Sequence, residues 1–543
     1  MMPLQIILRP RMGSRSAIRA AAWVRFAMLG VLFLSSFARM EAAIITAADD
    51  SQAAVQTAVQ AAQNGDTVKV PAGTGVWTST LLIAKNVQLI GAGIGQTIIV
   101  DEESRSGSGD HLITWTTLSN GFPRLSGFTF QGGVTNITPA VDGALSIGGT
   151  CASFRIDHCK FNLLYNKGVL IYEPVFGVVD HCTFIQTWNN GIEVYGSGIA
   201  GDSWGDGSWA TPVQWGSTNF LYIENCSFSY SGYPYPYVDD GYAGARIVFR
   251  YNSVTNEGFQ NHGTESAQRN RGCRAYEVYE NTFVQNAAGY NAGDPIYLRS
   301  GTGVIFSNTF TGYANMISLL NFRSTGNFMP WGSANGQNGW DSNNISGALA
   351  TGTHTAANNA NGVLTDSSQT WTINQWVGGY EVQDVALGGT NTGSYSLIIS
   401  NSAHDIYTLG DHLGVLIHWT NGAGYKIYQC YHQLDQIGLG SGDLVADTSP
   451  NSGIPINTTT GTPVWPHEVS EPMYQWGNTL NGTPNAAIGS TRGYGGCNII
   501  MLNRDYFDNT PKPGYTPLAY PHPLTLTTSR PSPPSNLDAG PSP

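Results

Sequence analysis

Charged residues are scarce in this sequence. Asp, Glu, Lys and Arg make up 11% of the 543 residues, and 37 acidic residues outnumber 25 basic ones, which gives a formal net charge of −12. A chain of this charge lacks the basic surface that phosphate backbones require, so we expect no nucleic acid partner. Low charge together with 66 glycines is typical of a large all-β protein.

Zinc-binding cysteine motifs are also missing. The seven cysteines are an odd number, and none forms a CxxC motif or a Cys/His pair with zinc spacing. We therefore expect no metal centre built from cysteine, and at least one cysteine without a disulfide partner in the same chain.

Long hydrophobic runs are absent after the N-terminal segment. Residues 26–37 are the one long apolar run, and five arginines but no acidic residue precede it. This pattern predicts a signal peptide over residues 1–38, with an uncleaved anchor as the alternative. The mature protein is then expected to be secreted, extracellular or periplasmic, with no membrane span. Its oligomeric state is not indicated.

A short pattern recurs along the chain: an apolar residue, two variable residues, Cys or Asn, one further residue, and usually Phe. The Cys or Asn positions are Cys159, Cys182, Cys226, Asn252, Asn281 and Asn308, with a weaker copy at Cys430. Successive copies are about 23 to 29 residues apart, apart from one double interval. A repeat of this length without room for a helix predicts an all-β, right-handed parallel β-helix.

Stacked coils place equivalent residues directly above one another, ~4.8 Å apart. The Asn residues should therefore form a ladder of side-chain amides, the Phe residues should stack in the core, and the Cys residues should take the ladder position as buried side chains.

The open N-terminal end of such a solenoid needs a cap. Asp50 or Ser51 can N-cap a helix that runs through Gln63 and has Val55 and Val59 on its apolar face. The following segments, 64–73 and 87–93, resemble the opening rungs of the pectate-lyase-like β-helix superfamily. That resemblance implies the fold and says little about the substrate.

Composition divides the rest of the chain. The β-helix with its N-terminal cap is expected over residues 39–347, a small β insert over 348–424, and the remainder of the β-helix with a C-terminal cap over 425–508. Residues 509–543 are rich in proline and are expected to form a disordered tail.

A second series of short strands, at 169–172, 192–195, 259–262 and 296–299, lies between copies of the repeat. Alternation points the second and fourth residues of each strand outward. Residues 237–241 belong to the same series, and we expect both of their carboxylates on this face. The expected cleft contains two outward columns of side chains. One column consists of Tyr172, Tyr195, His262 and Arg299, and the other of Glu193, Gln260 and Tyr297. The two acids expected beside these columns are Asp239 and Asp240.

Basic residues cluster beside this face. Arg269 and Arg271 lie with Glu265 in the segment 263–273, and Arg274 follows it. Together with Arg299 they could bind the carboxylates of an acidic glycan. Aromatic rings, acids, His and Arg on one sheet face are typical of a carbohydrate cleft, so a polysaccharide is the expected partner.

Three functions fit these residues. Asp239, Asp240, His262 and Arg299 are similar in order and spacing to the catalytic residues of the polygalacturonase family, which implies hydrolysis, although that family's Asn-Thr-Asp and Arg-x-Lys motifs are absent. In an inverting hydrolase one carboxyl group protonates the leaving oxygen and another activates water, and Asp239, Asp240 and Glu193 could supply these two groups.

Elimination by a polysaccharide lyase is the second possibility. Arg299 or His262 would act as the base and Tyr195 as the acid, with Ca²⁺ as the cofactor expected only in this case. The third function is glycan binding or adhesion without catalysis. The pairs Asp157-His158 and Asp180-His181 resemble a segment of pectate lyases, but they lie on the repeat strand, where a structural role is expected.

Overall fold

The protein is described by a computed structural model. It covers residues 42–526 with these segments left out: 105–110, 136–142, 166, 186–189, 200–203, 231–236, 265–269, 287–293, 322–347, 360, 378–379, 386–394, 409–415, 430–433, 441–467 and 494–499. The predicted signal peptide over 1–38 lies outside the described residues. No helix among the described residues is long and apolar enough to cross a membrane.

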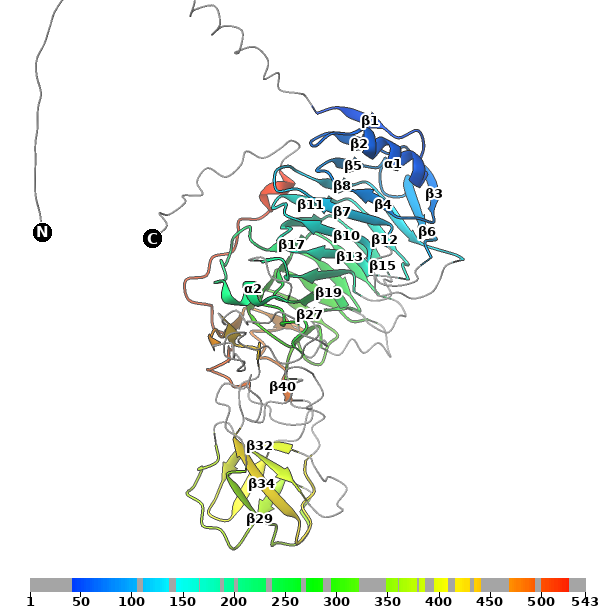
Figure 1. The fold of residues 1–543 in the computed structure, drawn as a ribbon. Helices are drawn as coiled ribbons and strands as arrows, with labels where there is room; N and C mark the ends of the chain where they lie inside the picture. The colour runs from blue at the N-terminus through cyan, green and yellow to red at the C-terminus, as the bar shows by residue number, and fades with distance from the viewer. Residues whose placement is uncertain are drawn as a thin grey trace, which may run out of the picture. The chain divides into compact units, whose positions relative to one another are not determined.

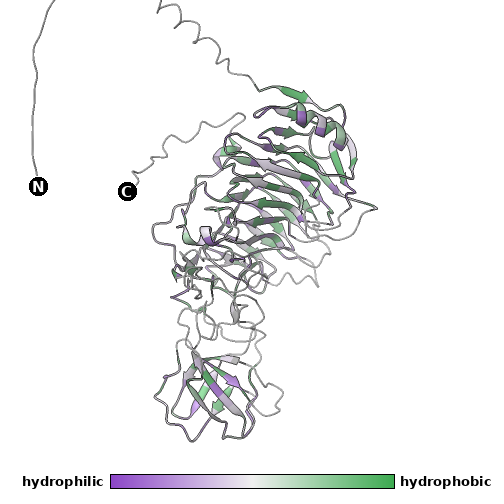
Figure 2. Cartoon of the chain, viewed as in Figure 1, coloured by the Kyte–Doolittle hydropathy of each residue, from purple (hydrophilic) through white to green (hydrophobic). Residues whose placement is uncertain are grey.

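The described chain winds into a right-handed parallel β-helix, as the repeat predicts. Successive turns visit three sheets in the order A, B, C, and the strands of each sheet stack rung upon rung (Figure 1). Every pairing within the three sheets is parallel except the last one in sheet B, between β38 and β39. Apolar residues are concentrated in these stacked strands (Figure 2).

The three sheets have the following strands. Sheet A contains β1 Ile44–Thr46, β2 Thr67–Lys69, β5 Gln88–Ile90, β8 Arg124–Ser126, β11 Phe154–Asp157, β14 Gly177–Asp180, β17 Leu221–Glu224, β20 Arg246–Arg250, β23 Ala275–Tyr279, β26 Thr302–Phe306, β37 Met473–Trp476 and β41 Tyr506–Phe507. Sheet B contains β3 Gly73–Trp77, β6 Thr97–Asp101, β9 Thr129–Gly132, β12 Lys160–Asn162, β15 Thr183–Ile185, β18 Ser227–Ser229, β21 Ser253–Thr255, β24 Thr282–Val284, β27 Thr309–Thr311, β38 Thr479–Leu480 and β39 Thr483–Pro484. Sheet C contains β4 Leu81–Ile83, β7 Ile113–Thr117, β10 Gly143–Gly149, β13 Lys167–Tyr172, β16 Ile192–Tyr195, β19 Tyr237–Tyr242, β22 Gly258–Gln260, β25 Ile296–Leu298, β28 Ile317–Asn321 and β40 Ser490–Gly493.

A helix caps the N-terminal end. Helix α1 spans Gln52–Ala61, with Ser51 as its N-cap, and it buries Val55, Ala58 and Val59. The predicted cap and apolar face are confirmed, and the helix ends two residues before the expected Gln63. Apolar residues that pack on the core thus close the open end of the solenoid.

The Asn residues of the repeat form the predicted ladder. The Asn281 side-chain nitrogen donates to the Asn308 side-chain oxygen at 2.9 Å, and the Asn281 oxygen accepts the backbone N–H of Asn252 at 2.9 Å. Asn308 bonds in the same way to Asn478, 170 residues further along the chain. The ladder therefore continues across the insertion, and Asn478 occupies the position that the sequence pattern assigned to Cys430.

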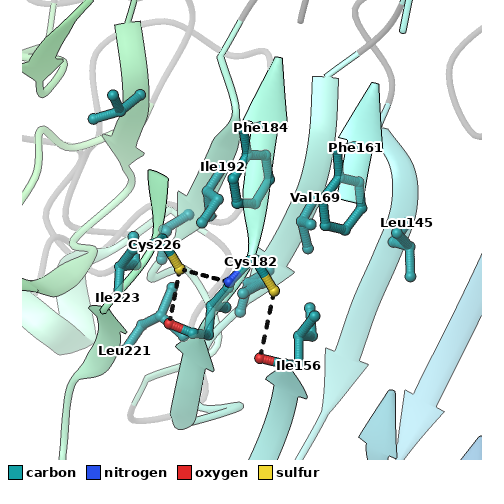
Figure 3. Close-up of a cluster of buried hydrophobic side chains, with 14 of the residues drawn as sticks. Leu145, Ile156, Phe161, Val169, Cys182, Phe184, Ile192, Leu221, Ile223 and Cys226 are labelled. Carbon is teal, nitrogen blue, oxygen red and sulfur yellow. Dashed lines mark hydrogen bonds between the residues drawn. The ribbon is translucent and has the colours of Figure 1, made fainter. Parts of the chain in front are cut away.

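The Phe and Cys residues stack as expected. The Phe161 and Phe184 rings lie 4.6 Å apart and nearly parallel, and Phe184 and Phe228 lie 4.7 Å apart. Cys182 and Cys226 are buried free thiols on adjacent rungs, and the Cys226 sulfur accepts the backbone N–H of Cys182 (Figure 3). Buried thiols thus occupy the Cys or Asn position of the repeat in some rungs, and side-chain amides occupy it in others.

The insert is a separate antiparallel sheet with its own core, which includes Trp371, Trp419 and Ile427. Its strands are β29 Ala350–Thr353, β30 Val363–Thr365, β31 Tyr380–Asp384, β32 Tyr395–Asn401, β33 Asp405–Thr408 and β34 Gly424–Gln429. The expected boundary at 424 and the seventh repeat copy are therefore wrong, because Ile427 pairs antiparallel with Ala350 and Val382 inside the insert. Parallel rungs resume at β37, after the small pair β35 Leu439–Gly440 and β36 Val469–Ser470.

The start of the expected tail is ordered against sheet A. The Tyr515 hydroxyl donates to Glu277 at 2.6 Å, Arg250 donates to the Leu518 carbonyl at 2.7 Å, and Leu524 in the 3₁₀ helix Pro523–Thr525 is buried. These contacts contradict a disordered segment beginning at 509, since outward residues of sheet A supply an apolar surface for it to cover. Residues 527–543 lie outside the described range.

The two Asp-His pairs have a structural role, as expected. Asp157 accepts two hydrogen bonds from Arg124, at 2.5 and 2.6 Å, and Asp180 accepts two from Arg155, each at 2.8 Å. His158 and His181 occupy left-handed turn positions at the corner and stack with ring centroids 5.1 Å apart. Both pairs therefore stabilise the corner after sheet A.

Candidate functional site

Side chains of sheet C form a continuous row on its outer face. Tyr172 of β13 is in register with Tyr195 of β16, which is in register with Tyr242 of β19. The ring centroids are 5.1 Å apart from Tyr172 to Tyr195 and 5.2 Å from Tyr195 to Tyr242, and the His262 ring lies 4.1 Å from Tyr242. We call these four residues the aromatic file.

The sequence prediction found three members of this file and missed Tyr242. It aligned the carboxylates of the rung containing 237–242 instead of its aromatic residue. The pattern Asp239-Asp240-Gly241-Tyr242 matches Ile192-Glu193-Val194-Tyr195 residue by residue, and this register would have identified Tyr242.

Asp239 does not lie on the outer face with Asp240, so its predicted place in the cleft is wrong. Adjacent strand residues point to opposite sides, and Asp239 is in register with the core residues Ile192 and Phe259. Its exposed fraction is 0%, and burial raises its pKa well above the usual value, with a further contribution from the charge of Asp240. A carboxyl group inside the solenoid cannot reach a polysaccharide.

A buried polar layer lies beside the aromatic file on the same sheet. It consists of Lys167, Asn190, Glu193, Asp240 and Gln260, all of them buried. The Asn190 side-chain nitrogen lies 3.2 Å from a Glu193 oxygen and 3.3 Å from an Asp240 oxygen. Gln260 donates to the same Asp240 oxygen at 2.9 Å, and Lys167 forms an ion pair with Glu193.

The Asp240 carboxyl contacts the aromatic file at His262. Burial raises its pKa from 3.8 to about 7, although Arg299, Lys167 and hydrogen bonds from Tyr242 and Asn190 act in the opposite direction. Asp240 lies on the predicted face of sheet C, in register with Glu193, but it is a buried group and does not face solvent.

His262 and Arg299 lie together, as the sequence analysis expected. The Asp240 carboxylate is 2.6 Å from His262 Nδ1, and the Tyr242 hydroxyl is 3.2 Å from His262 Nε2. An Arg299 guanidinium nitrogen donates to the Gln260 side-chain oxygen at 2.9 Å and lies 3.3 Å from His262 Nδ1. The His262 side chain keeps 17% of its surface exposed, so this corner of the site is open to solvent.

Tyr195 and Tyr297 are part of the same face. The Tyr195 hydroxyl donates to Glu193 in a short hydrogen bond, and burial together with the Glu193 charge raises the pKa of Tyr195. Tyr195 is thus engaged by Glu193, and its role as a proton donor to a leaving group stays a prediction. The Tyr297 ring lies beneath the Arg299 guanidinium at 5.5 Å.

The predicted basic patch is wrong for two of its arginines. Arg271 is fully buried and forms ion pairs with Asp206 at 2.8 Å, Asp435 at 2.7 Å and Glu468 at 2.8 Å. We call these four residues the Arg271 cluster. Asp206 is the first residue of helix α2, Asp206–Ala210. The Arg271 cluster therefore joins this helix to the C-terminal part of the chain, which contributes Asp435 and Glu468.

Arg274 is buried beside this cluster. It forms an ion pair with Glu471 at 2.8 Å, and its guanidinium lies 5.3 Å from the centre of the Trp209 ring. Arg271 lies 5.0 Å from the same ring. Neither arginine can bind a glycan, because protein side chains enclose both. Glu265 and Arg269 lie outside the described residues.

Among the described residues, no three or more His, Cys, Asp or Glu side chains form a group that could hold a metal ion. The expectation of Ca²⁺ in an elimination mechanism therefore stays a prediction.

Comparisons with known proteins add little to this geometry. No family model matches the chain, and no curated protein matches it. Solved structures match the chain only at low similarity. One is an alginate lyase from Paenibacillus sp. str. FPU-7, with 16% identity, a TM-score of 0.25, and coverage of 51% of this chain and 97% of that one. Another is a family 28 exopolygalacturonase from Yersinia enterocolitica, with 11% identity, a TM-score of 0.25, and coverage of 52% of this chain and 72% of that one, and a further one is the catalytic domain of a GH87 α-1,3-glucanase in complex with nigerose, with 12% identity, a TM-score of 0.20, and coverage of 53% of this chain and 59% of that one. At these TM-scores the likeness carries no argument, and membership of the pectate-lyase-like superfamily stays a prediction.

Proposed function

We propose that this protein is a polysaccharide lyase that cleaves a uronate-containing glycan by β-elimination on the outer face of sheet C. The observation that carries the proposal is the contact of His262 with Asp240 on one ring nitrogen and with Tyr242 on the other, next to Arg299. A base, an acid and a cation thus meet at the half-exposed end of the aromatic file.

Each residue has a role in this reaction. Asp240 holds the His262 Nδ1 proton, so Nε2 is left as the base that removes the proton beside the uronate carboxylate. The electrons of that C–H bond form a carbon–carbon double bond, and the bond to the glycosidic oxygen breaks. Tyr242 then donates its hydroxyl proton to the departing oxygen. The substrate replaces the contact between the Tyr242 hydroxyl and Nε2.

The pKa of Tyr242 supports its assignment as the acid. Burial and the nearby charges of Asp240 and Glu193 raise this pKa well above the usual value, so the phenol keeps its proton until the leaving oxygen develops charge. Arg299 would balance the carboxylate of the substrate, whose charge grows as the proton leaves.

Hydrolysis by the two outward carboxylates fits less well. Glu193 and Asp240 have exposed fractions of 0% and 1%, so neither reaches a glycosidic oxygen directly. One Asn190 nitrogen contacts both acids, whereas an inverting hydrolase needs about 6.5–9.5 Å between its carboxyl groups to hold a water molecule.

The test is incubation of the purified protein with polygalacturonate, alginate and a panel of other uronate polymers, with and without a chelator. Elimination creates an unsaturated uronate that absorbs in the ultraviolet, and His262→Ala should abolish that signal. New reducing ends without the absorbance would indicate a hydrolase. Binding without either product would indicate the non-catalytic alternative. Loss of activity with the chelator, restored by calcium, would support the predicted Ca²⁺ requirement.

We also propose that the protein is exported, on the basis of the arginines and apolar run in residues 1–38. Mass determination of the mature N-terminus after expression in a secreting host tests this. A mature chain that begins at Met1 would contradict it.

A further inference from the structure

Arg274 carries hydrogen-bond donors that the surrounding protein does not use. Its side chain is fully buried, and its Nε, Nη1 and Nη2 have no hydrogen-bond acceptor among the described residues. The Glu471 carboxylate lies 2.8 Å from Nη1 as an ion pair, outside the geometry of a hydrogen bond. The carboxylates of the neighbouring Arg271 cluster accept hydrogen bonds from Arg271 instead. A buried charged donor without an acceptor is costly, so it points to a ligand that satisfies it.

Two other arginines show what the same atoms do elsewhere in the molecule. In Arg124, Nε and Nη2 form a fork that donates to the two Asp157 carboxylate oxygens at 2.5 and 2.6 Å. In Arg155, the same fork donates to the two Asp180 oxygens, at 2.8 Å each. Such a fork matches an anion that can accept two parallel N–H bonds. The corresponding fork of Arg274 has no protein carboxylate on it.

The rest of the Arg274 guanidinium is already packed. Its central carbon lies over the Trp209 ring, 5.3 Å from the ring centre. At its Nη1 end, a Cβ added to Gly440 would lie only 2.6 Å from Nη1, so the absence of a side chain at this residue of β35 lets the arginine fit. The Nε and Nη2 edge is therefore the side at which a ligand would bind.

Other cations near Arg274 favour an anion over a water molecule at this edge. Burial and the Arg274 charge lower the pKa of Arg246 to about 10, although nearby carboxylates act in the opposite direction. The Arg246 guanidinium itself donates to uncharged oxygens of residues 208–212, at 2.8 to 3.3 Å. Burial and the Arg274 charge also lower the pKa of Lys512, against the effect of Glu471. An anion at Arg274 would thus be attracted by three positive groups.

We propose that the Nε and Nη2 edge of Arg274 binds a small inorganic anion, with chloride as the expected ligand. The site is enclosed, so a sugar is excluded and a compact ion is favoured. The ion would do for Arg274 what Asp157 and Asp180 do for Arg124 and Arg155. It would stabilise the contact of helix α2 with strand β35, and it does not depend on the proposed reaction.

The first experiment measures thermal unfolding in sodium chloride and in sodium methanesulfonate at the same ionic strength. Arg274→Lys keeps the positive charge but loses the fork, and Arg124→Lys is the matched control, because a protein carboxylate occupies its fork. Chloride should raise the unfolding temperature of the wild type and of Arg124→Lys by about 2 °C and leave Arg274→Lys unchanged. No chloride shift in the wild type would overturn the inference, as would an equal shift in Arg274→Lys.

The second experiment needs only the wild-type protein, so it decides the question even where Arg274→Lys does not fold. Crystals grown in sodium bromide are measured at the bromine absorption edge. An anomalous peak within hydrogen-bond distance of Arg274 Nε and Nη2 is the expected result. A water molecule at this edge without anomalous signal, or bromide bound only elsewhere on the protein, would overturn the inference.

Discussion

Arg271 and Arg299 lie at equivalent corners of consecutive rungs, after sheet C and before sheet A, yet their surroundings differ. Arg271 is enclosed with three carboxylates and an aromatic ring, and it has no contact with solvent. Arg299 is half-buried, with Gln260, Asn261 and His262 around it. Sequence analysis assigned both to one substrate-binding patch.

The comparison shows that the neighbours of a charged residue determine its role. A buried arginine matched by several carboxylates fixes one arrangement of the chain, and the pKa of Glu468 rises because burial and Asp435 disfavour its charge. A half-exposed arginine beside a histidine and an unusually basic carboxyl can respond to a substrate.

The largest effect is expected for His262→Ala, which removes the proposed base. We expect kcat to fall by about 10²–10⁴-fold on whichever uronate polymer the wild-type protein cleaves. The measurement is the rate of appearance of the unsaturated product. Retention of more than a tenth of the wild-type rate would exclude His262 as the base.

Arg271→Leu should mainly destabilise the fold, because it leaves three carboxylates buried without a cation. The expected loss in free energy of unfolding is about 3–5 kcal/mol, measured by chemical denaturation. Arg299→Leu is the matched variant, with a loss of about 1 kcal/mol but a large fall in activity. Similar losses of stability in the two variants would remove the distinction between the two corners.

Asp240→Asn should change the pH dependence of both stability and activity. The pKa of Asp240 is raised from 3.8 to about 7, so its contribution to stability is complete below pH 3.8 and is lost as the pH rises through about 7. The variant should therefore gain stability relative to the wild type between pH 4 and 8, as measured by denaturation across that range.

Activity should respond to the same group. Wild-type kcat/KM should rise as the pH passes about 7, because the ionised Asp240 holds the proton of His262 on Nδ1 and leaves Nε2 unprotonated. Asp240→Asn should lower kcat/KM and remove this step. A profile with the same midpoint in both proteins would assign the titration to another group.

The smallest effects are expected at the corner after sheet A. His158 is 58% exposed at its side chain and pairs with Asp157. His158→Ala and His181→Ala should leave kcat unchanged and alter stability by less than about 1 kcal/mol. A marked loss of activity in either variant would move the site to this corner and contradict the assignment to sheet C.

Much of the fold could be predicted from the sequence because stacking constrains the same position in every rung. Asn252, Asn281 and Asn308 repeat at the interval of one coil, and each amide bonds to the next. The weaker copy of the repeat at Ile427 was wrongly predicted to be a rung of the β-helix. A short apolar strand has the same local pattern in a parallel rung and in an antiparallel insert. Only its pairing partners distinguish the two.

The sequence predicted the face on which the candidate site lies, but not the charge pairs that the site residues form. Strand alternation correctly placed Tyr172, Tyr195, Gln260 and Tyr297 on the outer face, and it should have separated Asp239 from Asp240. It could not show which charges are matched by segments far away in the chain. Asp435 and Glu468 reach Arg271 across more than 160 residues.

The sequence by itself determined the solenoid, its N-terminal cap and the identity of the face that carries aromatic and polar side chains, because these depend on contacts one coil apart. Only the tertiary structure decided which of those side chains meet solvent, which carboxyl has a raised pKa, and which arginines are enclosed. Burial and charge pairing depend on everything that surrounds a group, including segments that no local repeat relates to it.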